Sequence, residues 1–192
     1  MESMAETVST DSGQAAPREA SPGALRHLLF VGVALLVVAL DQASKQTVRS
    51  FMDLYDYYPG DNWPVRFHYV TNTGAAFGVL QDQAAFLAVT SFIGVSAILL
   101  YYWSQSTGHR LITVAMGMML GGAAGNLIDR VRLGKVTDFI DFPHYPSFNL
   151  ADSSIVVAVV VLIVTYSFLE PRQQRDAERD AGGAGPAPAP DR

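Results

Sequence analysis

The sequence has 192 residues, of which 49% are hydrophobic and only 16% are charged, and its net charge is −5. Because charged residues make up about 25% of a typical soluble domain, this composition argues against a soluble protein. The sequence contains no cysteine, which excludes a thiol nucleophile, a disulfide framework and a cysteine-bound metal, and its acidic balance gives no sign of nucleic-acid binding.

Four apolar segments follow one another along the chain, each near the length of about 20 residues that a helix needs to cross a bilayer. They span 24–40, 84–103, 111–128 and 153–169, and the first ends abruptly at Asp41. Buried helices of a soluble protein are the alternative, but four such segments would leave almost no residues for a polar exterior. The sequence therefore predicts an all-α membrane protein with four transmembrane helices.

The two ends differ in composition from the part between them. Residues 1–22 are rich in Ala, Ser, Thr and Glu, and residues 171–192 end in GGAGPAPAP. Neither buries enough apolar area to offset the entropy of ordering it, so we predict a disordered leader, a membrane domain over 23–170, and a disordered tail. A cleaved signal peptide over 24–40 is the alternative, but the acidic leader and the following DQASKQ do not fit one.

Topology gathers the polar residues at one membrane face. An even number of spans puts both ends on one side, and the connections 41–83 and 129–152 emerge on the other. The 13 Lys and Arg residues divide as seven and six between the two sides, so charge bias does not predict orientation. Ionisable groups at membrane depth are functional candidates by default. The candidates on this face are Asp41, Lys45, Asn72, Asn126, Asp129, Arg130, Asp138, Asp141, Asn149 and Asp152.

Several candidates have a purely structural alternative. Asp41 and Lys45 are spaced as an (i, i+4) ion pair. Asn149 and Asp152 begin the fourth apolar segment, where such side chains cap free N–H groups. Asp138 has no such explanation, because it lies in the alternating stretch KVTDFIDF, a pattern typical of a strand.

Two further carboxylates need an assignment. Asp129 precedes Arg130 in GNLIDR, where the two side chains form either a helix-end ion pair or part of a functional site. Asp141 follows Asp138 by three residues, and a strand places such positions on opposite faces. The two strand carboxylates are therefore expected to face apart, and the spacing alone does not choose between them.

The residue types restrict the chemistry. Zinc needs clustered His, Glu or Cys ligands, yet there is no HExxH motif and the four histidines are scattered. No helix offers the Ser and His pair of a rhomboid-like protease, and Ser44 and Lys45 are neighbours that do not face each other on a helix. Paired aspartates remain, because two close carboxyls share one proton and so provide both an acid and a base. Such a site requires no metal and no cofactor.

Five motifs, in order, resemble those of the bacterial lipoprotein signal peptidases, also called signal peptidase II. The motifs are DQASK (41–45), TNTGAAFG (71–78), GNLIDR (125–130), VTDF (136–139) and FNLADSSI (148–155). The resemblance implies an aspartic endopeptidase that removes the signal peptide from prolipoproteins, cutting just before a cysteine that carries diacylglycerol. It also implies a monomer in the bacterial inner membrane, in contact with lipid, with both termini cytoplasmic and the site on the extracytoplasmic face.

Carried over residue by residue, the resemblance makes Asp138 and Asp152 the catalytic pair. The supporting or substrate-binding residues that it implies are Asp41, Lys45, Asn72, Gly74, Asn126, Asp129, Arg130 and Asn149. The first-turn position of Asp152 favours it as the initial base, with Asp138 as the acid, although a coupled pair can exchange these roles.

A small β-element is expected to cover the cleft, formed by 66–70 together with Phe77 and Gly78. Two other functions stay open. A small transporter needs charges inside the spans, whereas these lie at their ends. A non-enzymatic assembly protein gives no reason for Asp138 and Asp152 to lie close together.

Overall fold

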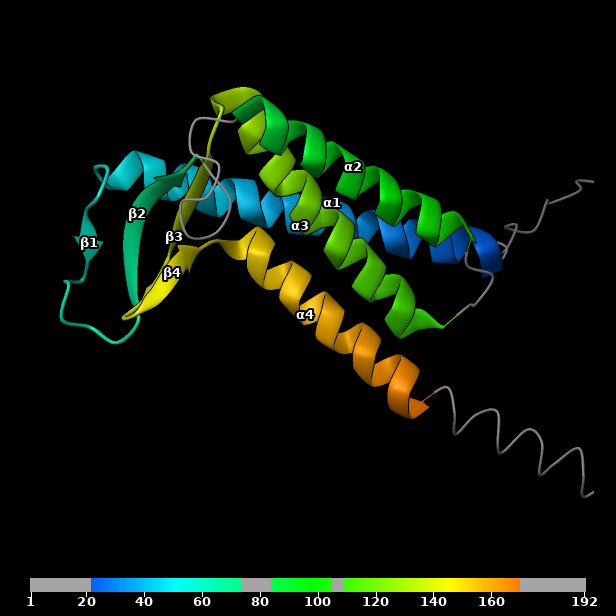
Figure 1. The fold of residues 1–192 in the computed structure, drawn as a ribbon. Helices are drawn as coiled ribbons and strands as arrows, with labels where there is room; N and C mark the ends of the chain where they lie inside the picture. The colour runs from blue at the N-terminus through cyan, green and yellow to red at the C-terminus, as the bar shows by residue number, and fades with distance from the viewer. Residues whose placement is uncertain (1–21, 74–83, 105–108, 170–192) are drawn as a thin grey trace, which may run out of the picture.

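Four helices dominate the computed structural model, which describes residues 22–73, 84–104 and 109–169 (Figure 1). Each is long and apolar enough to cross a membrane, which confirms the predicted four-span fold. The helices are α1 (Pro22–Phe51), α2 (Ala84–Ser104), α3 (Arg110–Leu133) and α4 (Leu150–Val164), the last continued by a π-helical turn, η2 (Thr165–Leu169).

The first helix is longer than its apolar segment. The sequence predicted an end at Asp41, but α1 continues to Phe51. The extension stays helical because its polar side chains find partners: Lys45 pairs with Asp41 and Asp129, and Arg49 reaches Thr137. Hydropathy therefore located the lipid-facing part of the helix and not its end.

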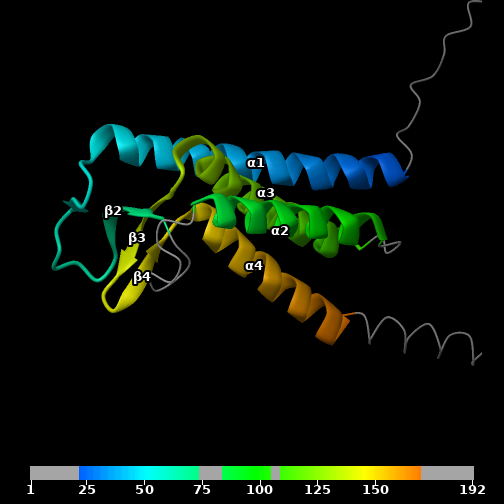
Figure 2. The same cartoon turned by 45° about the horizontal axis from the view of Figure 1, so that its top comes forward.

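A four-stranded antiparallel sheet lies at one end of the helical bundle, as Figures 1 and 2 show. Its strands, in spatial order, are β1 (Tyr57–Tyr58), β2 (Arg66–Asn72), β3 (Val136–Phe142) and β4 (Tyr145–Phe148). The start of α1 and the end of η2 lie at the opposite end of the bundle (Figures 1 and 2).

The strands agree with two of the expected extended stretches. Segment 66–70 lies in β2 and KVTDFIDF forms β3, and the two strands pair with Val70 opposite Asp138. Phe77 and Gly78, the other expected part of the β-element, lie outside the described residues. Asp138 thus lies on a strand that is paired on both sides, with β2 and with β4.

Helix α3 is the central helix and packs against α1, α2 and α4. Small residues let the backbones approach closely, as is common in membrane helices. A Cβ atom added at Gly121 would lie 2.7 Å from the carbonyl oxygen of Ala34 and 2.7 Å from the Cβ of Val37, both on α1. Glycine at this position is therefore required by the helix–helix distance.

We expect Gly121→Ala to lower the free energy of unfolding by about 1–3 kcal/mol, the usual cost of overpacking a tight contact. Gly94→Ala is the matched control, because Gly94 lies within the α2 span and a Cβ there would meet nothing within 4 Å. The control should be neutral, or more stable by about 0.5–1 kcal/mol from helix propensity. Unfolding of both variants in mixed detergent micelles measures the difference, and equal effects would contradict the close α1–α3 packing.

Candidate active site

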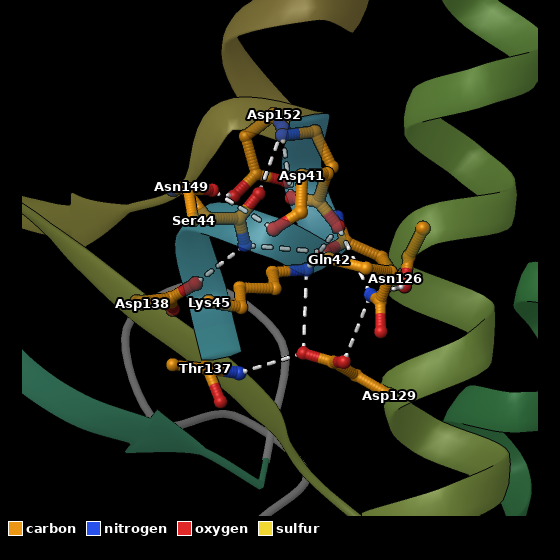
Figure 3. Close-up of polar contacts among 12 residues, drawn as sticks. Asp41, Gln42, Ser44, Lys45, Asn126, Asp129, Thr137, Asp138, Asn149 and Asp152 are labelled. Atoms are coloured by element: carbon orange, nitrogen blue, oxygen red, sulfur yellow. Dashed lines mark hydrogen bonds and ion pairs between the residues drawn. The ribbon is translucent and has the colours of Figure 1, made fainter. Parts of the chain in front are cut away.

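A buried polar network lies where the sheet meets the ends of α1, α3 and α4 (Figure 3). Each of its ionisable or amide members is at most 7% exposed, which is unusual for such side chains unless they are paired. The members are Asp41, Lys45, Asn126, Asp129, Asp138 and Asn149. Asp152 adjoins the network and is half-buried.

Asn149 joins the start of α4 to strand β3. It is the N-cap of α4, with its Oδ1 accepting from the Asp152 N–H (3.0 Å) and its own N–H donating to the Asp152 carboxylate (3.2 Å). This reciprocal capping agrees with the structural role expected for the two residues. The Asn149 Nδ2 atom also donates to Asp138 Oδ1 (2.7 Å). One residue thus contacts both aspartates of the VTDF and FNLAD motifs.

Asp138 is held between two amides and is 3% exposed. Its Oδ1 accepts from Asn149 and its Oδ2 accepts from Asn72 Nδ2 (3.2 Å). Burial and the negative charge of Asp152 raise the pKa of Asp138 to about 7, and the hydrogen bonds from Asn149 and Asn72 oppose that rise. A substantial fraction of Asp138 therefore keeps its proton at neutral pH.

Asn126 is oriented by three partners. Its Oδ1 accepts from Lys45 Nζ (2.9 Å) and from Asn149 Nδ2 (3.1 Å), and its Nδ2 donates to Asp152 Oδ1 (2.8 Å). Because both donors bind the amide oxygen, the amide nitrogen has to face the carboxylate. Lys45 thus acts on Asp152 through Asn126.

Lys45 is fully buried between two carboxylates. Its Nζ lies 2.9 Å from Asp41, the expected (i, i+4) pair, and 3.3 Å from Asp129. Asp41 also accepts from the Ala151 N–H (3.0 Å) in the first turn of α4, where a negative charge is favoured. The cluster therefore fixes the position of α4 relative to α1 and α3.

Three residues that contact the network were not singled out from the sequence. Gln42 donates to Asp41 (3.2 Å) and Asp129 (3.1 Å), and Arg49 donates to the Thr137 hydroxyl (2.9 Å). The Thr137 N–H donates to Asp129 (3.1 Å). Thr137, which directly precedes Asp138 in strand β3, is thus bound through both its hydroxyl and its backbone. Positions 41, 45 and 49 recur at four-residue spacing on one helix face, a signal that would have identified Arg49.

Asp141 lies apart from this network, as the strand alternation predicted. Its carboxylate accepts from Arg66 (2.6 Å) and Ser147 (2.7 Å). Burial alone would raise the pKa of Asp141, but the hydrogen bonds from Ser147 and Arg66 outweigh it, and the pKa lies below its usual value. A carboxylate that stays ionised and paired in this way stabilises the sheet.

Arg130 does not form the expected helix-end pair with Asp129. Adjacent residues on a helix point in different directions, and Arg130 instead donates to Ser91 Oγ on α2 (3.1 Å). Its Nε has no hydrogen-bond partner among the described residues, and its charge interacts with Asp152, Asp138 and, more weakly, Asp129. Of the remaining candidates, Asn72 contacts Asp138 and Gly74 lies outside the described residues.

The arrangement combines one carboxyl that retains a proton with a second, more accessible carboxylate beside it. Such a pair can deprotonate water and protonate a carbonyl oxygen in the same reaction. The surrounding amides and the buried ion cluster keep both groups in fixed orientations.

Comparisons with known proteins agree with the family that the five sequence motifs resemble. The family described as signal peptidase (SPase) II matches residues 33–168. The lipoprotein signal peptidase of Halothermothrix orenii is 40% identical over 132 residues, covering 69% of this chain and 90% of that protein. The one from Acinetobacter baumannii strain SDF is 34% identical over 163 residues, covering 79% of this chain and 90% of that protein.

Solved structures show the same fold. One bacterial membrane enzyme, determined by the in meso method at 2.3 Å resolution, has a TM-score of 0.65 and 26% identity, covering 82% of this chain and 93% of its own. Another, determined at 1.9 Å, has a TM-score of 0.66 and 29% identity, covering 73% of this chain and 93% of its own. The chain belongs to the signal peptidase II family, the lipoprotein signal peptidases.

Proposed function

We propose that this protein is an aspartic endopeptidase that removes signal peptides from diacylglyceryl-modified prolipoproteins, cutting just before the lipidated cysteine. The observation that carries the proposal is the joint contact of Asn149 with Asp138 and Asp152. It supports a working carboxyl pair made from the two motifs that the family resemblance assigns to catalysis. The family and the names of the relatives support the substrate class.

In the reaction that we assign, Asp152 takes a proton from a water molecule as the water oxygen attacks the scissile carbonyl carbon. Asp138 gives its proton to the carbonyl oxygen, so the intermediate is an uncharged tetrahedral diol. The C–N bond then breaks as Asp152 passes its proton to the leaving nitrogen and one diol hydroxyl returns a proton to Asp138. Both carboxyls regain their initial states, and no metal or cofactor takes part.

The supporting residues act at two levels. Asn126 and Asn149 bind the catalytic carboxyls directly, and Asp41, Lys45 and Asp129 hold α1, α3, α4 and strand β3 in position around them. Their value lies in preorganisation, because a correctly placed pair avoids reorganisation during the reaction. Asn72 holds the second oxygen of Asp138. Arg130, with its Nε unpaired within the described part of the chain, is assigned to the substrate backbone.

We place the protein in the bacterial inner membrane as a monomer, with both termini cytoplasmic and the site on the extracytoplasmic face. The start of α1 and the end of η2 lie at the bundle end opposite the sheet, which supports only the placement of both termini on the side away from the site (Figures 1 and 2). The membrane domain that we propose spans 23–170, and the predicted leader 1–22 and tail 171–192 lie outside the described residues apart from Pro22. Transport would need charges inside the spans, and an assembly role gives no reason for Asp138 and Asp152 to share the partner Asn149.

Purified full-length protein in detergent tests the proposal against two substrates, a prolipoprotein with the diacylglyceryl group and the same prolipoprotein without it. Mass spectrometry of the products should show a single cut directly before the cysteine of the modified substrate only. An intact modified substrate after prolonged incubation with folded protein would overturn the peptidase assignment. Cleavage of both substrates at equal rates would overturn the requirement for the lipid.

A further inference from the structure

A pocket of about 570 Å³ lies where the β3–β4 hairpin meets α4. Phe142, Tyr145 and Phe148 line it on the hairpin, and Val156 and Val157 line it on α4. The Phe148 ring stacks on that of Phe142 (6.0 Å between centroids) and meets that of Tyr145 edge-on (5.9 Å). The pocket is within the usual range of about 300–1,000 Å³ for small-molecule sites, and its aromatic side is a packed surface.

The pocket is continuous with the candidate active site. Among the described residues, Asp152 and Ser153 also line it, and Asp152 is the carboxylate that accepts from Asn126 and caps against Asn149. Any group that fills the pocket therefore lies beside the bond on which Asp152 would act. The occupant has to be a part of the substrate close to the cleavage point.

The lining favours hydrocarbon over peptide. A peptide must be extended at the scissile bond, because a helix would engage the carbonyl in its own hydrogen bonds, and an extended backbone needs polar partners. The polar groups of the lining are few, and Ser153 Oγ already donates to the carbonyl oxygen of Asn149 (3.0 Å). An acyl chain needs no such partners.

We propose that this pocket receives an acyl chain of the diacylglyceryl group on the substrate cysteine, an assignment that rests on the proposed function above. Because lipid tails are as apolar as the pocket, the chain gains little by leaving the bilayer. Its effect is orientation: the packed aromatic surface holds the lipid and so places the attached cysteine next to Asp152. The hairpin thus recognises the lipid directly beside the catalytic pair.

The test compares Val157→Trp with Val160→Trp, two substitutions on exposed positions of α4. Val157 lines the pocket and is 49% exposed, whereas Val160 lies one turn further, is 54% exposed and does not line it. Each variant cleaves a dipalmitoylglyceryl-modified and a dibutanoylglyceryl-modified prolipoprotein of the same sequence. The readout is the ratio of kcat/KM for the long-chain substrate to that for the short-chain one.

Val157→Trp should lower this ratio about ten-fold, the cost of placing bulk in an occupied site, and Val160→Trp should leave it at the wild-type value. An unchanged ratio in Val157→Trp would overturn the inference and would indicate that lipid of the surrounding bilayer, and not the substrate, fills the pocket. Equal losses on both substrates would also overturn it, because the pocket would then receive peptide. Failure of the wild type to cut either substrate would instead refute the proposed function.

Discussion

Asp138→Asn and Asp152→Asn should each reduce cleavage of the lipidated prolipoprotein by about 10³-fold or more, the scale of general acid–base catalysis. Asparagine keeps the size of the side chain and an oxygen that accepts a hydrogen bond, but it does not exchange a proton. Asn149 can still donate to the new amide oxygen at position 138, whereas the hydrogen bond from Asn72 is lost because the new amide nitrogen does not accept. Initial cleavage rates at fixed enzyme and substrate concentration measure the loss.

Asp141→Asn is the matched control, because Asp141 lies on the same strand but contacts Arg66 and Ser147 instead of the catalytic network. It should keep most of the wild-type activity. The opposite pattern, an active Asp138→Asn and an inactive Asp141→Asn, would contradict the assignment of the acid. Thermal unfolding of all three variants separates a loss of catalysis from a loss of folding.

Lys45→Met should lower the free energy of unfolding by about 3–5 kcal/mol, the cost of breaking a buried ion pair by removing one partner. Lys45 is fully buried, and Asp41 and Asp129 are 0% and 1% exposed, so neither carboxylate gains solvent in its place. The substitution also removes the donor that orients Asn126. Unfolding by SDS in mixed micelles, followed by circular dichroism, measures the change.

Two further variants sharpen this test. Gln46→Met, at the next, exposed position of α1, should change stability by less than about 0.5 kcal/mol. The double variant Lys45→Met/Asp129→Asn should be more stable than Lys45→Met alone, because it removes one of the two buried carboxylate charges that Lys45 compensates. A double variant that is less stable than the single one would show that Lys45 contributes through packing and not through charge.

The sequence was sufficient to predict the architecture. Four apolar segments identified the four spans, and the alternation in KVTDFIDF identified β3 and separated Asp138 from Asp141. The predicted end of α1, at Asp41, was wrong because hydropathy reports the environment of a helix and not its length. Polar residues beyond Asp41 stay helical through contacts with α3 and β3 that no local pattern contains.

The residues of the site could be predicted from the sequence, but the contacts between them could not. The motifs indicated Asn149 as a helix cap, but its bond to Asp138 depends on how the β3–β4 hairpin returns to α4. The partner of Arg130 was missed for the same reason, since Ser91 is on another helix. Contacts between distant segments follow from packing, which a single sequence does not specify.

The central claim is that Asp138 and Asp152 hold one proton between them and use it in catalysis. Its most direct test is the pH dependence of kcat/KM, which reports the ionisations of the free enzyme, for the wild type on a lipidated prolipoprotein without titrating groups near the cleavage point. Because the pKa of Asp138 is raised to about 7, its acid form predominates below that value and is lost as the pH rises through it.

We therefore predict that kcat/KM falls above about pH 7 with the loss of one proton, and falls again in acid as the pair takes up a second proton. A kcat/KM that instead rises steadily through pH 8 and 9 would contradict a carboxyl acid and would point to a base outside this pair.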